Sequence, residues 1–361
     1  MLILYITYID FGEASSGSGV RPVKMYDAFR AAGHEVRLLS GAQGSAKTRG
    51  TRLAAVTETV QWLDDHRPDL CYIESPVYPI LWSADYRLIR KIHRMGIPIG
   101  YFYRDFYLRF PDLYPGRTDL RGRLKDQYLA YMQKKTDRLL DCADIVYFPS
   151  LAATKLFSYR DMRALPPAGE IREDVTRRQE NNTCIYVGGM GGHYGGENLL
   201  RAFELLNDGD ERFPLLLICR QAEWAALPPE RKTGSWLEVH HTYGSGLPPL
   251  YQRAALAVLP VEKTAYTDLA VNIKLFEYMS YGLPIASTDV TAVSRLVEDN
   301  GVGRVSGDSP EAIAENIRAM LADPKAMDRW SRNAVRSLES SHLWIHRARQ
   351  VVRELTEKRK R

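Results

Sequence analysis

The chain has 361 residues, of which 45% are apolar and 26% are charged. This is the composition of a globular protein, and it excludes a disordered chain, a fibrous protein and a small disulfide-stapled domain. At roughly 150 residues per domain, the length predicts two domains.

The apolar runs are all far shorter than the ~20 residues that cross a bilayer. The apolar start of the chain, residues 1–9, has no basic leader and is followed by Asp10, so we expect a first buried strand and not a signal peptide. No CxxC spacing occurs among the four cysteines, which predicts reduced thiols in a cytoplasmic protein. They are Cys71, Cys142, Cys184 and Cys219.

Positive charge is concentrated in the first half. The chain has 49 basic and 44 acidic residues, whereas residues 87–138 alone carry 13 basic against 5 acidic residues, a local net charge of +8. Such a region attracts polyanions or an anionic membrane surface. A solvated charged face has the same composition. Residues 87–138 are therefore interpreted either as a membrane-docking surface on the inner leaflet of the plasma membrane or as plain solvated surface.

In chain order, the first half alternates short apolar runs with amphipathic stretches, which predicts a parallel sheet covered by helices. Leu124, Tyr128, Met132 and Leu139 recur at near-helical spacing, so we expect that face of the helix to lie in the core. The predicted strands are 2–8, 35–39, 70–74, 97–103 and 145–148, and the predicted helices are 21–32, 52–65, 85–94 and 121–142.

The alternation stops at a Pro/Gly-rich segment and then restarts, which predicts a linker over 166–182. The expected fold is α/β, with two doubly wound Rossmann-like domains facing across a cleft, at 1–165 and 183–340. Residues 341–361 are expected to form a helix that crosses back to the first domain. The later elements are expected at 184–187, 198–206, 215–219, 237–240, 247–254, 257–259, 273–281, 284–287 and 310–321.

Two glycine-rich segments follow predicted strands, as in dinucleotide-binding proteins. Residues 17–22 have Pro22 where the third glycine of GxGxxG is required, and residues 188–196 have Tyr194 there. The second strand also ends without the acidic residue that holds a ribose. A nicotinamide dehydrogenase is therefore disfavoured, although both segments still suit close backbone approach to an anion or a sugar hydroxyl.

Four segments resemble GT-B glycosyltransferases, especially glycosyltransferase family 4. Residues 26–36, which read YDAFRAAGHEV, resemble the first helix and second strand of that family, and residues 185–189 resemble its "vG" strand. Residues 247–254 resemble a further helix. The most specific segment is 272–286, NIKLFEYMSYGLPIA, which is similar to "K.fEymA.G.Pvva". The resemblance covers nearly the whole chain.

The resemblance implies transfer of a sugar from a nucleoside-diphosphate sugar, a UDP- or GDP-sugar, with no metal and no other cofactor. It places the donor in the second domain, at Gly188, Gly189, Asp268, Asn272, Lys274 and Glu277, with backbone contacts to the base at Tyr243 and Gly244. The acceptor, a glycan or a lipid-linked sugar, is expected in the first domain at Gly17, Ser18, Gly19 and Tyr103. The pathway implied is bacterial surface polysaccharide biosynthesis.

The donor motif also has a physical rationale. Lys274 and Glu277 lie three residues apart at the start of a predicted helix, so both can face one ligand. The helix N-terminus and Lys274 would stabilise a diphosphate, and Glu277 would accept hydrogen bonds from the ribose hydroxyls. A surface Lys–Glu pair is the alternative.

The sequence departs from the family pattern in three places: at the two cations of the glycine-rich loop, at the E-x7-E motif and at the histidine after the fifth strand. The family's Arg after "vG" is Gly189 here, and its Lys six residues later is Gly195. The first Glu of its E-x7-E motif is Leu269, with Asp268 beside it. We expect Lys274 and Arg104 to replace the missing cations.

The family's His after the fifth strand falls at Arg104, followed by Asp105 within the aromatic run 101–107. Asp105 is a candidate general base for the acceptor hydroxyl, which would give inversion; it is alternatively an orienting group, or half of a structural ion pair. A non-catalytic GT-B partner subunit or glycan-binding module is kept as an alternative because of the missing residues. An epimerase or phosphorylase is disfavoured, since no matching catalytic acids or cofactor lysine motif occur.

Overall fold

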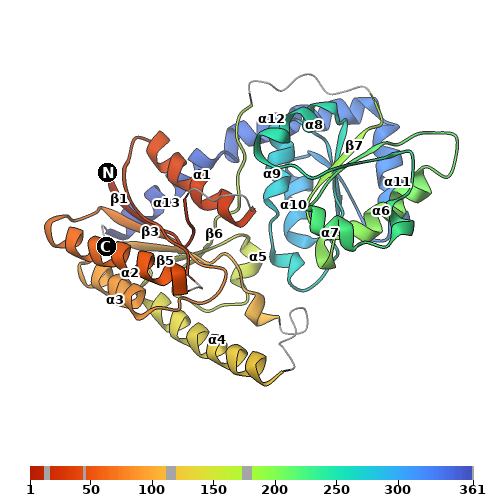
Figure 1. Cartoon of the computed structure of the whole chain (residues 1–361). Helices are drawn as coiled ribbons and strands as arrows, with labels where there is room; N and C mark the ends of the chain where they lie inside the picture. Colours follow the sequence, from red (N-terminus) through yellow and green to blue (C-terminus); the bar gives the residue numbers. More distant parts are fainter. Residues whose placement is uncertain (12–16, 44–45, 111–118, 173–180, 360–361) are drawn as a thin grey trace. The chain divides into compact units, whose positions relative to one another are not determined.

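The structure is a computed structural model that describes residues 1–11, 17–43, 46–110, 119–172 and 181–359. The chain divides into two compact units (Figure 1). The first contains Met1–Pro166 and Trp344–Arg361, and the second contains Pro167–Leu343. None of the described helices is both long and apolar enough to traverse a lipid bilayer.

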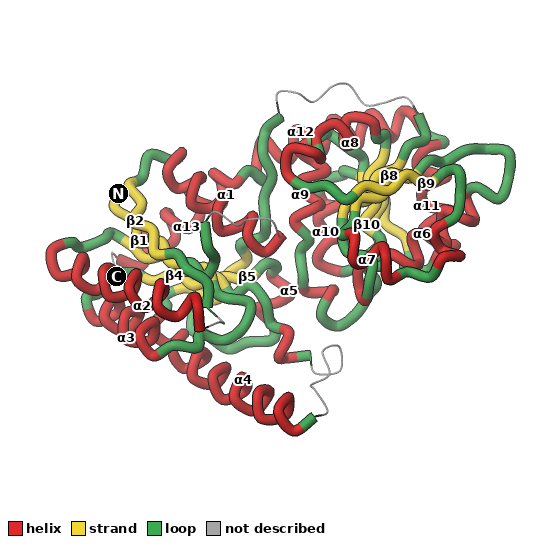
Figure 2. Tube along the Cα trace, in the orientation of Figure 1, coloured by secondary structure: helices red, strands yellow, loops and turns green. Residues whose placement is uncertain are grey.

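The first unit is a parallel sheet between two layers of helices. Its strand order is β2-β1-β3-β4-β5-β6, so the direction of winding changes between β1 and β3. Helices α1 and α13 pack on each other over one face, whereas α2, α3 and α4 cover the other (Figures 1 and 2). The strands are β1 Leu2–Ile6, β2 Glu35–Leu39, β3 Leu70–Glu74, β4 Ile99–Phe102, β5 Ile145–Phe148 and β6 Met162–Ala164. The helices are α1 Gly17–Ala31, α2 Ala46–Asp65, α3 Ser83–Arg94, α4 Leu120–Leu139, α5 Leu151–Thr154 and α13 Trp344–Arg359.

A buried ion pair holds α1 against the sheet. Arg21 Nε donates to Glu74 Oε1 at 3.0 Å, and Glu74 is fully buried at the end of β3. The Arg21 guanidinium lies 3.5 Å from the centre of the Phe102 ring and 5.9 Å from that of Trp344. The C-terminal helix α13 is therefore part of the first unit's core, as the sequence predicted.

The second unit is also a parallel sheet with helices on both faces. Its order is β12-β11-β10-β7-β8-β9, the doubly wound Rossmann arrangement, in which winding reverses between β7 and β10. The strands are β7 Cys184–Val187, β8 Leu215–Ile218, β9 Leu237–His240, β10 Leu256–Leu259, β11 Ile285–Thr288 and β12 Gly303–Ser306. The helices are α6 Gly196–Leu206, α7 Gln221–Ala226, α8 Pro248–Arg253, α9 Ile273–Ser280, α10 Thr291–Asp299, α11 Pro310–Leu321 and α12 Pro324–Ser341.

The start of the expected linker packs on the second unit. The Gly169 N–H donates to the His342 carbonyl at 2.9 Å, and the Glu170 N–H donates to Ser280 Oγ at 3.1 Å. A Cβ at Gly169 would lie 2.5 Å from Ser280 Oγ, so this close approach requires glycine. Residues 173–180 of the expected linker lie outside the described residues.

Two expectations in the first unit are wrong. Gly17, Ser18 and Gly19 form the first turn of α1, whereas the sequence suggested a loop before a helix at residue 21. In α4, Leu124 and Tyr128 are 58% and 50% exposed, although we expected them to be buried. Met132 and Leu139 of the same predicted face are buried, as expected. The spacing thus predicted the face, but it does not say along what length of the helix the core covers that face.

Candidate functional site

The carboxyl ends of β7 and β10 flank the point where the second sheet reverses its winding, the place where ligands bind in such sheets. The loop after β7 spans residues 188–196 and leads into α6. The Val187 N–H donates to the Tyr278 hydroxyl at 3.0 Å, which ties the end of β7 to α9. The Gly188 N–H donates to the Ile218 carbonyl of β8 at 3.0 Å.

Two glycines of this loop leave no room for a side chain. Gly195 has φ +73°, and a Cβ there would lie 1.7 Å from the Pro260 carbonyl oxygen after β10. A Cβ at Gly189 would lie 2.8 Å from the Tyr194 ring. At Gly195 the close neighbour is backbone, and at Gly189 it is the Tyr194 side chain, so the packing of this loop favours glycine at both positions where the resemblance implies a cation.

Three of the predicted donor-binding residues lie together at the start of α9. Asn272 is the N-cap, and its Oδ1 accepts from the Lys274 N–H at 2.8 Å. Lys274 Nζ donates to Glu277 Oε2 at 2.6 Å. The two side chains are 21% and 27% exposed, so both remain reachable by a ligand. The structure therefore brings Asn272, Lys274 and Glu277 together.

An aromatic residue orients the Glu277 carboxylate. The Tyr251 hydroxyl of α8 donates to Glu277 Oε1 at 2.9 Å, and its ring stacks on Tyr281 at 4.4 Å. Burial, with the Glu277 charge as the next cause, raises the pKa of Tyr251 well above its ordinary value, so it stays a donor. The sequence analysis missed Tyr251, although its place in the segment 247–254 was a signal.

The other predicted donor residues lie apart from this group. Asp268 Oδ1 accepts from both the N–H and the hydroxyl of Thr291 at 2.8 Å, so this carboxylate caps α10. Tyr243 follows β9, the edge strand, and is 72% exposed. Gly244 beside it has φ +56° and begins a short turn.

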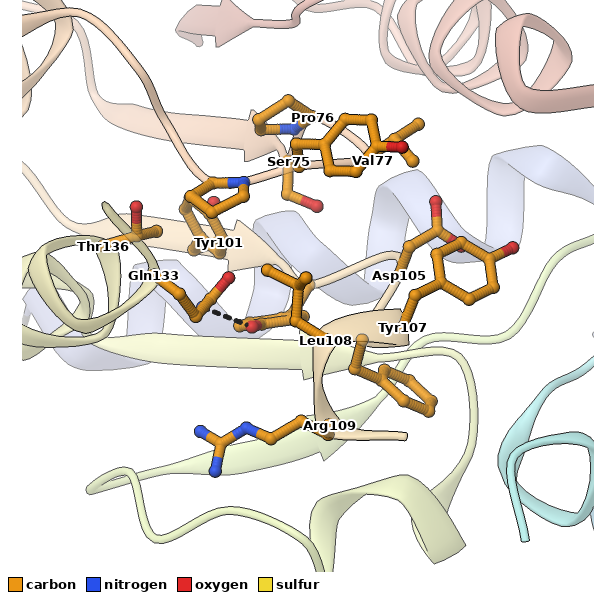
Figure 3. A pocket seen from close by; sticks show the side chains of 14 residues that line it. Ser75, Pro76, Val77, Tyr101, Asp105, Tyr107, Leu108, Arg109, Gln133 and Thr136 are labelled. Carbon is orange, nitrogen blue, oxygen red and sulfur yellow. Dashed lines mark hydrogen bonds between the residues drawn. The ribbon is translucent and has the colours of Figure 1, made fainter. Parts of the chain in front are cut away.

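In the first unit, a small cavity opens at the ends of β3 and β4 (Figure 3). Tyr103, Asp105, Gln133 and Ser75 contribute polar groups to its wall, beside aromatic and apolar side chains. Gln133 Nε2 donates to the Tyr103 hydroxyl at 2.7 Å. Burial raises the pKa of Tyr103, which therefore stays protonated and can donate in turn.

The predicted catalytic residues of this unit are an ion pair at the cavity. Arg104 Nε donates to Asp105 Oδ2 at 3.0 Å, and both side chains are mostly buried. The Arg104 N–H donates to Ser75 Oγ at 2.9 Å, which fixes the turn after β4. Tyr103 and Asp105 thus share one cavity. Gly19 is not among the described residues that line it, and the Ser18 side chain lies outside the described part of the chain.

No group of three or more His, Cys, Asp or Glu side chains with the geometry of a metal site occurs in the described part of the chain. The sequence analysis also missed His193, which lies in the loop after β7, and Gln133 on the inner face of α4. A histidine inside a glycine-rich loop was the available signal for the first. Nothing in the sequence marked Gln133, because its role depends on contact with a distant strand.

Solved structures share this architecture over nearly the whole chain. Sucrose-phosphate synthase from Thermosynechococcus elongatus matches with a TM-score of 0.71 and 14% identity, covering 99% of each chain. HepE from Anabaena, in complex with UDP and glucose, matches with a TM-score of 0.66 and 13% identity over 99% of this chain and 100% of that one. WaaG, a glycosyltransferase involved in lipopolysaccharide biosynthesis, matches with a TM-score of 0.63 and 17% identity over 97% and 98%.

The fold is therefore that of the GT-B glycosyltransferases, as predicted. Residues 181–323, which lie within the second unit, match the family model described as Glycosyl transferases group 1. A search of curated proteins by sequence finds no match. The second unit therefore contains a match to a glycosyltransferase family, within a fold that solved glycosyltransferases share.

Proposed function

We propose that the chain transfers a sugar from a nucleoside-diphosphate sugar, a UDP- or GDP-sugar, to a hydroxyl of a glycan or a lipid-linked sugar, without a metal ion. The bond between the anomeric carbon and the diphosphate oxygen breaks, and a bond to the acceptor oxygen forms. The acceptor proton leaves, and the nucleoside diphosphate is released. Four of the similar structures, among them that of HepE, are complexes with UDP, which supports this class of donor.

The pairing of Lys274 with Glu277 carries the donor assignment. Lys274 has three N–H donors and uses one for Glu277, so it can donate to a diphosphate without breaking the pair. The N-terminus of α9 adds a partial positive charge beside it. Glu277, held by Tyr251, has acceptor positions left for ribose hydroxyls. Gly188 and Gly189 allow close backbone approach.

Asp268 and Tyr243 are proposed at the edge of the donor site. Asp268 supports it by capping α10, and its position next to α9 in the chain agrees with the degenerate family motif. Tyr243 and the Gly244 backbone are placed at the base, because they follow a strand whose carboxyl end lies on the ligand side of the sheet.

We place the acceptor in the cavity of the first unit. Its wall combines aromatic rings with hydroxyl, amide and carboxylate groups, the combination that holds a sugar ring. Among the described lining residues Asp105 is the only carboxylate, and Arg104 orients it. Asp105 either takes the acceptor proton or orients the hydroxyl. Inversion at the anomeric carbon, read by NMR of the product, supports the first role. The turn of α1 at Gly17–Gly19 is proposed as a further acceptor contact.

A membrane-bound acceptor is supported by the outer face of α4. Leu120, Leu124, Tyr128 and Tyr131 are 50–74% exposed and follow i, i+4, i+8, i+11 spacing, which aligns them in one stripe. Basic residues flank the stripe, the pattern of helices that lie on anionic lipid surfaces. The flanking residues are Arg121, Lys125, Lys134 and Arg138.

This surface also supports a role in bacterial surface polysaccharide biosynthesis at the inner leaflet of the plasma membrane. WaaG, one of the similar structures, acts in such a pathway. Flotation with liposomes of 30% phosphatidylglycerol, compared with pure phosphatidylcholine, tests the docking. We expect flotation only with the anionic vesicles and its loss in Leu124→Gln. Equal recovery in the soluble fraction from both vesicles would contradict the membrane proposal.

Product formation tests the function itself. Purified chain is incubated with a panel of UDP- and GDP-sugars and lipid-linked or free glycan acceptors, with and without EDTA. We expect one donor class to be consumed, with activity retained in EDTA. The Lys274→Ala variant should lose transfer. If neither transfer nor donor hydrolysis occurs with any donor, the proposal fails.

A further inference from the structure

The glycine-rich loop after β7 contains a single basic side chain. Residues 188–196 read GGMGGHYGG, so His193 is the only titratable base that the loop can offer to a ligand. The other histidines of the second unit lie outside this loop, at residues 240, 241 and 342. The His240 imidazole bonds Glu238 at 2.7 Å, and that of His342 bonds Asn300 at 3.2 Å.

The geometry holds His193 between the two loops that border the donor site. Its ring stacks on Tyr194 with centres 4.7 Å apart, and meets the edge of Tyr266 at 5.8 Å. Tyr266 belongs to the loop after β10. The His193 carbonyl accepts from the Glu262 N–H of the same loop at 3.0 Å. The imidazole is thus fixed at the carboxyl ends of β7 and β10.

The loop carries no other cation. At the positions where the resemblance implies Arg and Lys, a Cβ at Gly195 would meet the Pro260 carbonyl and one at Gly189 would meet the Tyr194 ring, so the present packing favours glycine at both. A cation on this side of the donor would therefore come from another residue.

We propose that the His193 imidazole binds the diphosphate of the donor and takes up a proton as it does so. The inference rests on the proposed function, and it assigns to that site a second cation beside Lys274. His193 is a donor-binding residue that stabilises the leaving group.

The surroundings explain why the proton arrives with the ligand. Burial lowers the pKa of His193, so the ring is neutral near pH 7 before a ligand binds. Glu262 lies on the adjoining loop, and its own pKa is raised by burial and by the charges of Asp308 and Glu197. A diphosphate brings further negative charge beside the ring, which raises the imidazole pKa.

Calorimetry on the full chain tests this. UDP and GDP are titrated between pH 5.5 and 8 in buffers of different ionisation enthalpy, with uridine and guanosine as phosphate-free probes. Wild type should take up a proton on binding the diphosphate and bind it more tightly at pH 6 than at pH 8. His193→Gln should weaken diphosphate binding by about tenfold at pH 6, the scale of one hydrogen bond to a charged group. It should also reduce proton uptake and leave nucleoside binding unchanged.

Two further variants keep the result unambiguous. His193→Lys supplies a permanent charge and should flatten the pH dependence; it serves alone if His193→Gln does not fold. His66→Gln, on α2 of the first unit, is the matched control and should behave as wild type. Unchanged affinity, proton uptake and pH slope in the His193 variants would overturn the inference while nucleotide binding by wild type still supports the proposed function. Wild type that binds no diphosphate and hydrolyses no donor would overturn both.

Discussion

Lys274→Ala is the substitution that most directly tests the donor site. Lys274 Nζ lies 2.6 Å from Glu277 Oε2, and its side chain is 21% exposed, so a diphosphate at the start of α9 is in reach of a partly desolvated ammonium group. One hydrogen bond to a charged group contributes about 1.5–3 kcal/mol. Removing it should raise the dissociation constant of a nucleoside diphosphate about 10- to 150-fold.

The fold should survive this change. The Lys274–Glu277 pair is a partly exposed i,i+3 pair, which contributes no more than about 1 kcal/mol to the free energy of unfolding. Asn272 still caps the helix through its contact with the backbone N–H of residue 274. A lower affinity with an unchanged melting temperature therefore reports the lost contact to the ligand.

Calorimetry with matched ligands separates the two charged residues. Lys274→Ala should weaken UDP or GDP binding but leave the parent nucleoside unaffected, because the lysine is assigned to the phosphates. Glu277→Gln should weaken both, because the carboxylate is assigned to the ribose. Lys91→Ala, which removes a half-buried lysine of the first unit that pairs with Asp64, is the control. Wild-type affinity in Lys274→Ala would refute the donor assignment.

Three further predictions concern catalysis, packing and acid stability. Asp105→Asn should lower turnover at least tenfold while donor affinity stays constant, and near-normal turnover would exclude the base role. Gly195→Ala should lower the free energy of unfolding in urea by about 2 kcal/mol or more, through its left-handed backbone and the Cβ contact; Gly191→Ala, where a Cβ meets nothing within 4 Å, should change it by less than about 0.5 kcal/mol. Arg253 lowers the pKa of Glu238 to about 2. A carboxyl whose folded pKa is depressed stabilises the fold above its unfolded pKa of about 4.5, and this is lost as pH falls toward 2. Glu238→Gln should therefore destabilise the protein more at pH 6 than at pH 2.5, as urea melts at both values would show.

The central strands were predictable because burial on both faces leaves a continuous apolar run. The run at β7 ends at the same residues in sequence and structure, and so does that at β3. Two of the four edge strands lack this signal, whereas the other two, β2 and β9, were predicted with the bounds they have. The strand β12, Gly303–Ser306, is half exposed and contains Arg and Ser, so it was not predicted. The same holds for β6, Met162–Ala164, at the edge of the first sheet.

The residues of the candidate site also differ in whether local sequence or long-range packing brings them together. Asn272, Lys274 and Glu277 are neighbours on one short helix, and their spacing alone brings them together. Tyr251 joins them only because α8 packs beside α9, and no local pattern reports that contact. The expected burial of Leu124 and Tyr128 in α4 was wrong for a related reason. An apolar period of 3.6 predicts which face of a helix is apolar, but not what covers that face along its length.

The missing cations show how such long-range contacts alter the meaning of a motif. In the sequence, Gly189 and Gly195 stand where the family has functional side chains, and they motivate the alternative of a subunit without activity. In the structure, Gly195 allows the loop after β7 to reach the Pro260 carbonyl of the loop after β10. That approach also brings His193 against Tyr266. The glycine at residue 195 and the position of the His193 imidazole thus depend on the same packing of the two loops. A lysine introduced at residue 195 should therefore displace the loop after β7 and should not restore a diphosphate contact.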